Sequence, residues 1–148
     1  KNLITLSFDG YLRIWSTKNW DLVHQFHAHA CSGVGLSFFP GCCLALSIGD
    51  DKQLKLWDLH QMKLTSTGNL ISSPKIVHVS PRMDCYAIVF DRCLKTFDIR
   101  TNESQTIHSP NPILSIDFLN ENRLIFSGES KTITVYQMKP SISKYMSW

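Results

Sequence analysis

The 148-residue sequence contains no long apolar run, and none of its apolar stretches approaches the roughly 18 residues that a membrane-spanning helix needs. No signal-peptide pattern opens the chain, no stretch keeps a helical periodicity, and no segment is of low complexity. These absences argue against a helical membrane protein and against a helical bundle. They predict an all-β protein without a membrane partner.

Cysteine motifs and charge clusters are missing as well. The five cysteines form no C-x-x-C pair, and Cys42 and Cys43 are adjacent, which suits neither a disulfide framework nor a zinc site. A reducing compartment, cytosol or nucleus, is therefore expected. The net charge of +3 comes from scattered basic residues and is too weak by itself to indicate nucleic acid. Glycine-rich phosphate loops are also absent, and we expect neither a cofactor nor a small-molecule substrate.

What the sequence does contain is an internal repeat, because an aromatic residue follows each of four tight turns at nearly constant spacing. The aromatic residues are Trp15, Trp57, Phe97 and Tyr136. They stand 42, 40 and 39 residues apart. The residues six positions before them are Asp9, Asp51, Asp91 and Ser130. Four matched points in so short a chain predict four copies of one structural unit.

Each unit contains short runs in which apolar and polar residues alternate, the pattern of half-buried strands. The second unit is the clearest, with a Gly-Asp turn between its middle two runs. Its predicted strands are Gly33–Phe38, Leu44–Ile48, Leu54–Leu59 and Lys63–Thr67. The first unit has Leu3–Ser7, Leu12–Trp15 and Asp21–Phe26; the third has Lys75–Val79, Tyr86–Phe90, Leu94–Ile99 and Ser104–Ile107; the fourth has Ile113–Phe118, Leu124–Ser127 and Thr132–Gln137.

The units, residues 1–30, 31–70, 71–110 and 111–148, resemble WD-repeat blades, whose period is roughly 40–45 residues. The predicted fold is a WD-repeat β-propeller with about three and a half four-stranded antiparallel blades. A blade needs neighbours on both faces, and a seven-bladed ring would need roughly 280–300 residues. We therefore expect the sequence to be about half of a propeller.

Four residues of the second unit form the most conspicuous polar set: His29, Ser47, Asp51 and Trp57. Serine, histidine and aspartate could be interpreted as a hydrolase triad, but a triad needs an exposed nucleophile and an oxyanion hole. Ser47 lies in the middle of a predicted strand. We therefore predict a structural hydrogen-bond relay, in which Asp51 orients His29, His29 bonds to Ser47, and the Trp57 indole closes the chain. No catalytic residue is expected.

The other units keep only part of this set. The first has Thr5, Asp9 and Trp15, and its histidine would precede residue 1. The third keeps Asp91, has Phe97 for tryptophan, and places Ala87 at the serine position. The members of the fourth unit are Phe126, Ser130 and Tyr136. We expect apolar packing to hold these units.

Two alternatives stay open for the remaining polar residues. His24, His27 and Cys31, together with His29, could be interpreted as metal ligands, although no second pair follows at zinc-finger spacing. We therefore predict no metal site. Basic residues two positions before the aromatic residue could form a positive rim for RNA or an acidic protein, although solvated strand positions are the simpler interpretation. They are Arg13, Lys55 and Lys95.

Several local features resemble one branch of the WD-repeat proteins, the PAK-kinase-interacting-protein family. An outer strand of the form K-x-W-D/E leads to Ala28-His29 in place of the usual Gly-His. Residues 46–52 are similar to the family's L-S-V-G-x-D-K turn, and residues 76–82 to its I-V-x-x-S-P-R segment. Residues 113–119 are similar to its I-S-S-V-x-F-L segment.

The yeast members of that family are assembly factors of the large ribosomal subunit, and other members are described as binding p21-activated kinases. The resemblance therefore implies a non-catalytic scaffold in the nucleus and nucleolus. It implies protein partners in a pre-large-subunit particle, or alternatively a PAK-type kinase as the partner. Contact with rRNA stays an open alternative that rests on the basic residues. The resemblance carries over no partner-binding residue.

Overall fold

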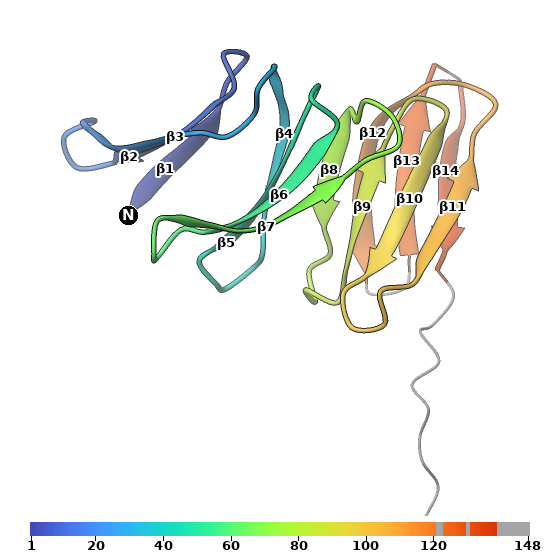
Figure 1. The fold of residues 1–148 in the computed structure, drawn as a ribbon. Helices are drawn as coiled ribbons and strands as arrows, with labels where there is room; N and C mark the ends of the chain where they lie inside the picture. The colour runs from blue at the N-terminus through green and yellow to red at the C-terminus, as the bar shows by residue number, and fades with distance from the viewer. Residues whose placement is uncertain (121–122, 130, 139–148) are drawn as a thin grey trace, which may run out of the picture.

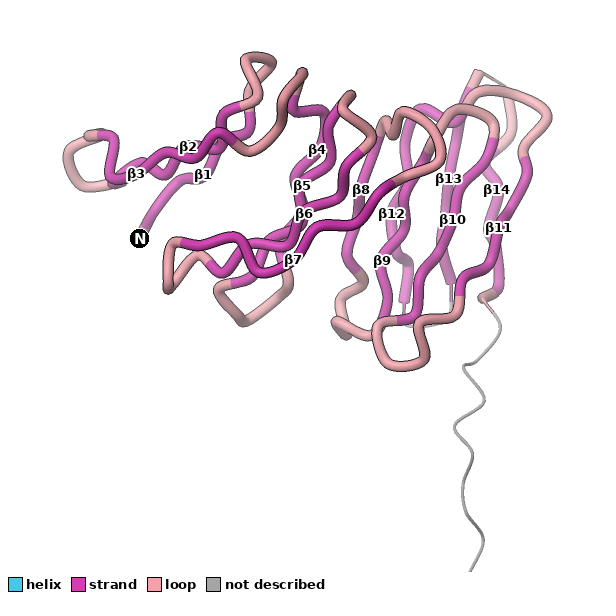
Figure 2. Tube along the Cα trace, viewed as in Figure 1, coloured by secondary structure: helices cyan, strands magenta, loops and turns pink. Residues whose placement is uncertain are grey.

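The computed structural model describes residues 1–120, 123–129 and 131–138, and every regular element in this part of the chain is a β-strand (Figures 1 and 2). Within it, no helix is present that could cross a membrane. Each predicted strand is found, with its ends shifted by at most two residues. The prediction of an all-β fold is confirmed. Ser130 and the end of the fourth unit, residues 139–148, lie outside the described residues.

The strands form four antiparallel sheets in which order along the chain equals order across the sheet. The first sheet contains β1 (Asn2–Leu6), β2 (Tyr11–Ser16) and β3 (Leu22–His27). The second contains β4 (Gly33–Phe38), β5 (Leu44–Gly49), β6 (Gln53–Asp58) and β7 (Lys63–Asn69). The third contains β8 (Ile76–Val79), β9 (Cys85–Val89), β10 (Cys93–Asp98) and β11 (Ser104–His108). The fourth contains β12 (Ile113–Asn120), β13 (Arg123–Gly128) and β14 (Ile133–Gln137).

The sheets stand side by side in chain order, as blades of a partial propeller (Figure 1). The first strands of the second, third and fourth sheets, β4, β8 and β12, contact one another in sequence. The last strand of each sheet lies at its far edge. This arrangement gives every sheet one inner edge, one outer edge and two faces, and the faces are available for packing against neighbouring sheets.

The core is divided among the three spaces between sheets, because neighbouring residues of a strand point to opposite faces. The middle strand β9 shows this directly. Ala87 and Val89 pack toward the fourth sheet, whereas Ile88, between them, packs toward the second. All three are fully buried. Strands buried on both faces explain why the apolar runs of the sequence carry so few charged residues.

The Trp-Asp pair that ends β6 also makes the turn that follows. The Oδ1 atom of Asp58 accepts hydrogen bonds from the backbone amides of His60 and Gln61, at 2.9 and 2.8 Å. Asp98 holds the equivalent turn of the third sheet in the same way. These aspartates satisfy amides that have no strand partner, so the outer strand begins at a fixed point.

The buried position of Leu94 predicts that its truncation will be costly. Leu94 has 0% exposure and packs between the third and fourth sheets. Leu94→Ala should lower the free energy of unfolding by about 2–5 kcal/mol, through lost apolar burial and the cavity it leaves. Leu119→Ala is the matched control because Leu119 is 54% exposed. Chemical denaturation measures both, and equal losses would contradict the core described above.

Candidate functional site

The structure brings His29, Ser47, Asp51 and Trp57 together between the first and second sheets. Ser47 lies in β5 and Trp57 in β6, Asp51 lies in the turn that joins them, and His29 lies in the loop that leads from β3 to β4. The backbone amide of His29 donates to the Gly10 carbonyl at 3.0 Å, which fixes this loop against the first sheet. The four-residue set therefore joins two sheets.

The side chains form one continuous hydrogen-bonded chain. The Trp57 indole Nε1 lies 2.9 Å from the Ser47 Oγ atom, and that oxygen lies 2.8 Å from His29 Nε2. On the other side of the ring, His29 Nδ1 lies 2.9 Å from Asp51 Oδ1. The side chains of Ser47, His29 and Trp57 are buried, and that of Asp51 is 9% exposed. We propose that this chain is a structural relay.

The proton positions follow from the partners. An indole nitrogen can only donate, so Ser47 accepts from Trp57. A carboxylate can only accept, so the proton of a neutral imidazole lies on Nδ1, facing Asp51. His29 Nε2 then accepts the Ser47 hydroxyl proton. Burial lowers the pKa of His29, and this effect outweighs the raising effect of Asp51. The imidazole is therefore neutral, and every donor in the chain has one acceptor.

Asp51 anchors this chain to two backbone segments. Its Oδ2 atom accepts from the amide of Ala30 at 3.1 Å, and its Oδ1 atom from the amide of Gln53 at 3.2 Å. Burial raises the pKa of the Asp51 carboxyl, but the hydrogen bonds from His29, Ala30 and Gln53 outweigh it, so the pKa lies below its ordinary value. The carboxylate is charged and holds the turn, the loop and the imidazole in one arrangement.

Gly49 is a residue of the site whose role the sequence did not reveal. A Cβ atom at Gly49 would lie 2.5 Å from the His29 ring and 2.8 Å from Asp51 Oδ1. No side chain fits there while the histidine occupies its place. The sequence does show a glycine directly after Ser47-Ile48, but a turn accounts for that glycine equally well.

The geometry offers no access to an external substrate. Ser47 has 0% exposure, and its hydroxyl is bonded to both Trp57 and His29. A serine nucleophile must instead present a free oxygen beside donors for an oxyanion.

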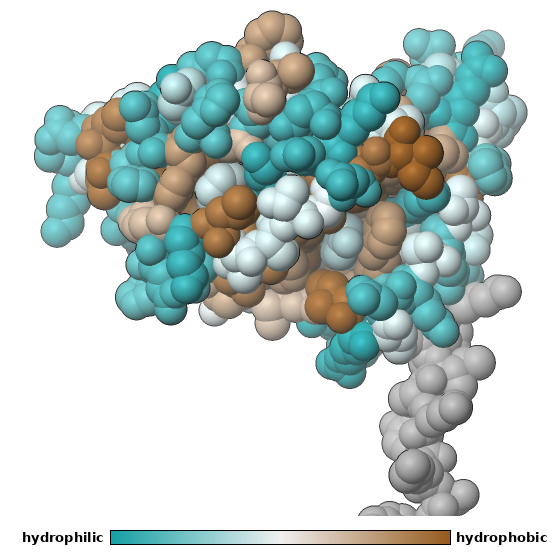
Figure 3. Space-filling model, viewed as in Figure 1, coloured by the Kyte–Doolittle hydropathy of each residue, from teal (hydrophilic) through white to brown (hydrophobic). Residues whose placement is uncertain are grey.

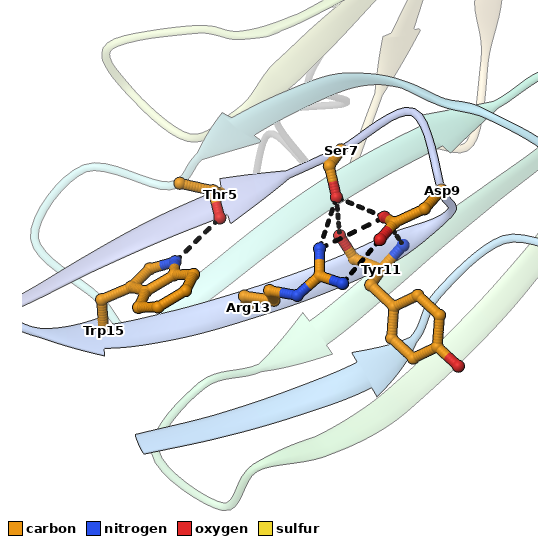
Figure 4. Close-up of polar contacts among 6 residues, drawn as sticks. All are labelled: Thr5, Ser7, Asp9, Tyr11, Arg13 and Trp15. Carbon is orange, nitrogen blue, oxygen red and sulfur yellow. Dashed lines mark hydrogen bonds and ion pairs between the residues drawn. The ribbon is translucent and has the colours of Figure 1, made fainter. Parts of the chain in front are cut away.

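In the first sheet, Trp15 and Thr5 repeat the tryptophan–hydroxyl bond, but the aspartate has a different partner (Figure 4). Trp15 Nε1 donates to Thr5 Oγ1 at 3.0 Å. Asp9 pairs with Arg13, whose Nη2 lies 2.5 Å from Asp9 Oδ2, while Arg13 Nη1 donates to Ser7 Oγ at 2.7 Å. Arg13 and Ser7 hold the pKa of Asp9 well below its usual range. Asp9 thus closes its own hairpin.

The third sheet replaces the polar chain with apolar contacts. Phe97 stacks on Tyr86 with ring centroids 5.0 Å apart, and Asp91 pairs with Lys75 at 2.5 Å. The prediction that Ala87 stands at the serine position is wrong. Ile88 lies opposite Lys95, as Ser47 lies opposite Lys55, because the paired positions stand seven residues apart in the third sheet (95 − 88) and eight in the second (55 − 47). An isoleucine at the serine position excludes a second relay here.

In the fourth sheet, Tyr136 lies opposite Leu124 and packs against the core between the third and fourth sheets. Phe126, opposite Thr134, takes the position of Ser47. It is buried in the same core. Aromatic side chains therefore fill both of the positions that Ser47 and Trp57 occupy in the second sheet.

The histidines considered as metal ligands and the basic residues considered as a positive rim have other partners in the structure. His24 contacts the Phe26 ring, and His27 the Tyr11 ring. In the part of the chain that the structure describes, no three histidine, cysteine, aspartate or glutamate residues gather in a way that could hold a metal. Arg13 is bonded to Asp9, and the Lys55 ammonium donates to a backbone carbonyl. Two of the three proposed rim cations therefore bind within the chain.

These features define a WD-repeat propeller, and comparison with known proteins agrees. The model of the family described as WD domain, G-beta repeat, matches residues 20–58, the stretch that contains the complete polar set. The crystal structure of the RRP9 WD40 repeats superposes with a TM-score of 0.83, covering 95% of this chain and 43% of that one. Its sequence is 16% identical, so this similarity concerns the fold. The chain is a WD-repeat protein with the fold of a partial β-propeller.

Among curated proteins, the sequence is similar to those named p21-activated protein kinase-interacting protein 1-like. The protein from Xenopus laevis is 30% identical over 136 residues, 91% of this chain and 38% of that protein. The one from Danio rerio is 31% identical over 141 residues, 93% of this chain and 38% of that protein. The chain thus spans less than two fifths of the length of these relatives.

The relay predicts a specific cost for losing its carboxylate. Asp51→Ala should lower the free energy of unfolding by about 1–3 kcal/mol, because the His29 Nδ1–H and two backbone amides lose their acceptor. Asp50→Ala, in the same turn but exposed, should stay within about 0.5 kcal/mol of the parent. Urea denaturation compares them, and coinciding midpoints for both variants and the parent would rule out the relay.

The lowered pKa of His29 also predicts a pH dependence. The unfolded chain takes up a proton near pH 6.5, whereas the folded chain resists it, so this stability is present above that pH and is lost on acidification. The difference in unfolding free energy between the parent and His29→Gln should therefore shrink from about pH 7.5 to about pH 5.5. A difference that grows on acidification would show a protonated imidazole in the folded protein.

Proposed function

We propose that the protein is a non-catalytic scaffold that binds other proteins and takes part in assembling the large ribosomal subunit. The observation that carries the proposal is the similarity over nine tenths of the chain to the p21-activated protein kinase-interacting protein 1-like proteins. The family resemblance described above, with its yeast assembly factors, implies the ribosomal part. The structure supports the scaffold part. Its most complete polar set is buried and internally satisfied, which leaves the loops at the two ends of the sheets to contact partners.

This function requires the protein to reside in the nucleus, chiefly in the nucleolus, and to contact proteins of a pre-large-subunit particle. Direct contact with rRNA would also require basic side chains that are available to bind phosphate groups. Arg13 and Lys55 are tied within the chain, so an RNA contact would depend on other basic residues, such as the exposed Lys18 and Arg100.

A second function is favoured by the names of the relatives, which describe proteins that interact with p21-activated protein kinase. A kinase adaptor would use the same rigid loops and would likewise carry no catalytic residue of its own. The two functions differ in the size of the complex and in its RNA content, so one experiment separates them.

The test is affinity purification of the tagged full-length protein followed by sucrose-gradient sedimentation. A role in ribosome assembly predicts that the protein sediments with precursor large-subunit particles and moves to the top of the gradient after ribonuclease treatment. The unfolding control is Asp51→Ala, which should lose co-sedimentation only to the extent that it loses folded protein. Sedimentation as a small, ribonuclease-resistant complex containing a kinase would overturn the ribosomal function and support the adaptor.

A further inference from the structure

One side-chain position in the outer strand connects the first sheet to the second and the third sheet to the fourth, but in the second sheet this position holds a glycine. In the first sheet this position, opposite Leu12, is Phe26, whose ring lies 5.0 Å from the Trp57 ring. In the third sheet the position opposite Leu94 is Ile107, which is 9% exposed in the core shared with the fourth sheet. In the second sheet the position opposite Leu54 is Gly68.

The glycine leaves real space. A Cβ atom built at Gly68 would meet no atom within 4 Å, and the residue is not among those with a left-handed backbone, so neither crowding nor conformation requires glycine. Leu54, opposite Gly68, is only partly buried, as are Tyr86 and Phe97, which pack against the same core between the second and third sheets. The space around the Cβ position of Gly68, on the same face of the sheet as Leu54, is therefore open, and we call it the Gly68 gap.

The part of β7 that carries the gap, Ser66–Asn69, is also an unprotected edge. All seven residues of β7 are exposed, and among the described strands β7 pairs with β6 alone. Edge strands are usually protected by proline, charge or a bulge. β7 has no proline and a single charged residue, Lys63, and its one register shift lies near Leu64, so Ser66–Asn69 stays regular. Figure 3 shows pale, near-neutral residues in the middle of the surface, where Figure 1 draws β7.

We propose that an extended segment of a partner protein adds to β7 as a further strand and places one large apolar side chain in the Gly68 gap. Residues opposite each other in neighbouring strands point to the same face, so a side chain opposite Gly68 points toward the third sheet. The main chain of β7 supplies hydrogen bonds, and the gap supplies specificity. The occupant continues the established contact between the second and third sheets.

Charge limits the occupant further. The only charged residue of β7 is Lys63, and no acidic residue lies in the strand. A segment with a carboxylate at the end that meets Lys63, and with uncharged residues along Ser66–Asn69, is therefore favoured. This surface lies on the outer edge of the second sheet, so it serves a ribosomal or a kinase complex equally and does not depend on that choice.

The test uses the full-length protein and a synthetic eight-residue peptide that alternates threonine with valine, carries one central leucine, and ends in glutamate. The first control peptide has serine in place of leucine, and the second is N-methylated on alternate amides so that it cannot pair with a strand edge. Calorimetry measures affinity, and hydrogen exchange measures protection of the β7 amides. The parent should bind the leucine peptide and protect β7, and each control peptide should bind at least about tenfold more weakly.

Two protein variants separate the gap from the strand. Gly68→Ile fills the gap from within, so it should weaken peptide binding at least about tenfold while its unfolding midpoint stays at or above the parent's. Thr67→Ile is the matched control, because Thr67 lies opposite Lys55 and points to the other face. Undiminished binding to Gly68→Ile, equal binding of the N-methylated peptide, failure of the parent to bind, or pairing of β7 with a second copy of the chain would each overturn the proposal.

Discussion

Every sheet of this protein depends on apolar contact with the sheet beside it. Ala87 and Val89 face one neighbour and Ile88 the other, so a single strand contributes to two cores at once. A sheet separated from its neighbours would expose both sets of side chains to water, at a cost of about 25 cal/mol for each Å². Stability is therefore a property of the stack, and each unit of the repeat is meaningful only beside the next.

The buried polar chain of the second sheet works within that constraint rather than against it. Four polar groups enter an apolar space, and each donor finds one acceptor: Trp57 donates to Ser47, Ser47 to His29, and His29 to Asp51. The neutral histidine is what makes this arrangement consistent, because a charged imidazole would donate from Nε2 to Ser47 and leave the Ser47 hydroxyl proton without its acceptor. These hydrogen bonds are directional, so they fix the position of the second sheet against the first, which apolar packing alone would not do.

The sequence reveals the fold well because the repeat multiplies a weak signal. Alternation placed the strands to within two residues, and the spacing of Trp57 and Asp51 located the polar set that the structure brings together. Pairing across strands could not be obtained in this way. A pairing register tighter by one residue places Ile88 where Ala87 was expected. Asp9 pairs with Arg13, since a spacing pattern does not say which neighbour satisfies a carboxylate. The crowding at Gly49 is likewise visible only in three dimensions.

The unequal distribution of polar and apolar contacts has a consequence for how the repeats change over evolutionary time. In the third sheet, where Phe97 stacks on Tyr86 and Ile88 fills the serine position, a substitution succeeds whenever volume is roughly kept, so single steps can accumulate independently. In the second sheet, each of the four residues is the hydrogen-bond partner of another, so a single replacement leaves a buried polar group without its partner. That unit can drift only by coordinated replacement, and it should preserve the ancestral repeat long after its neighbours have lost it.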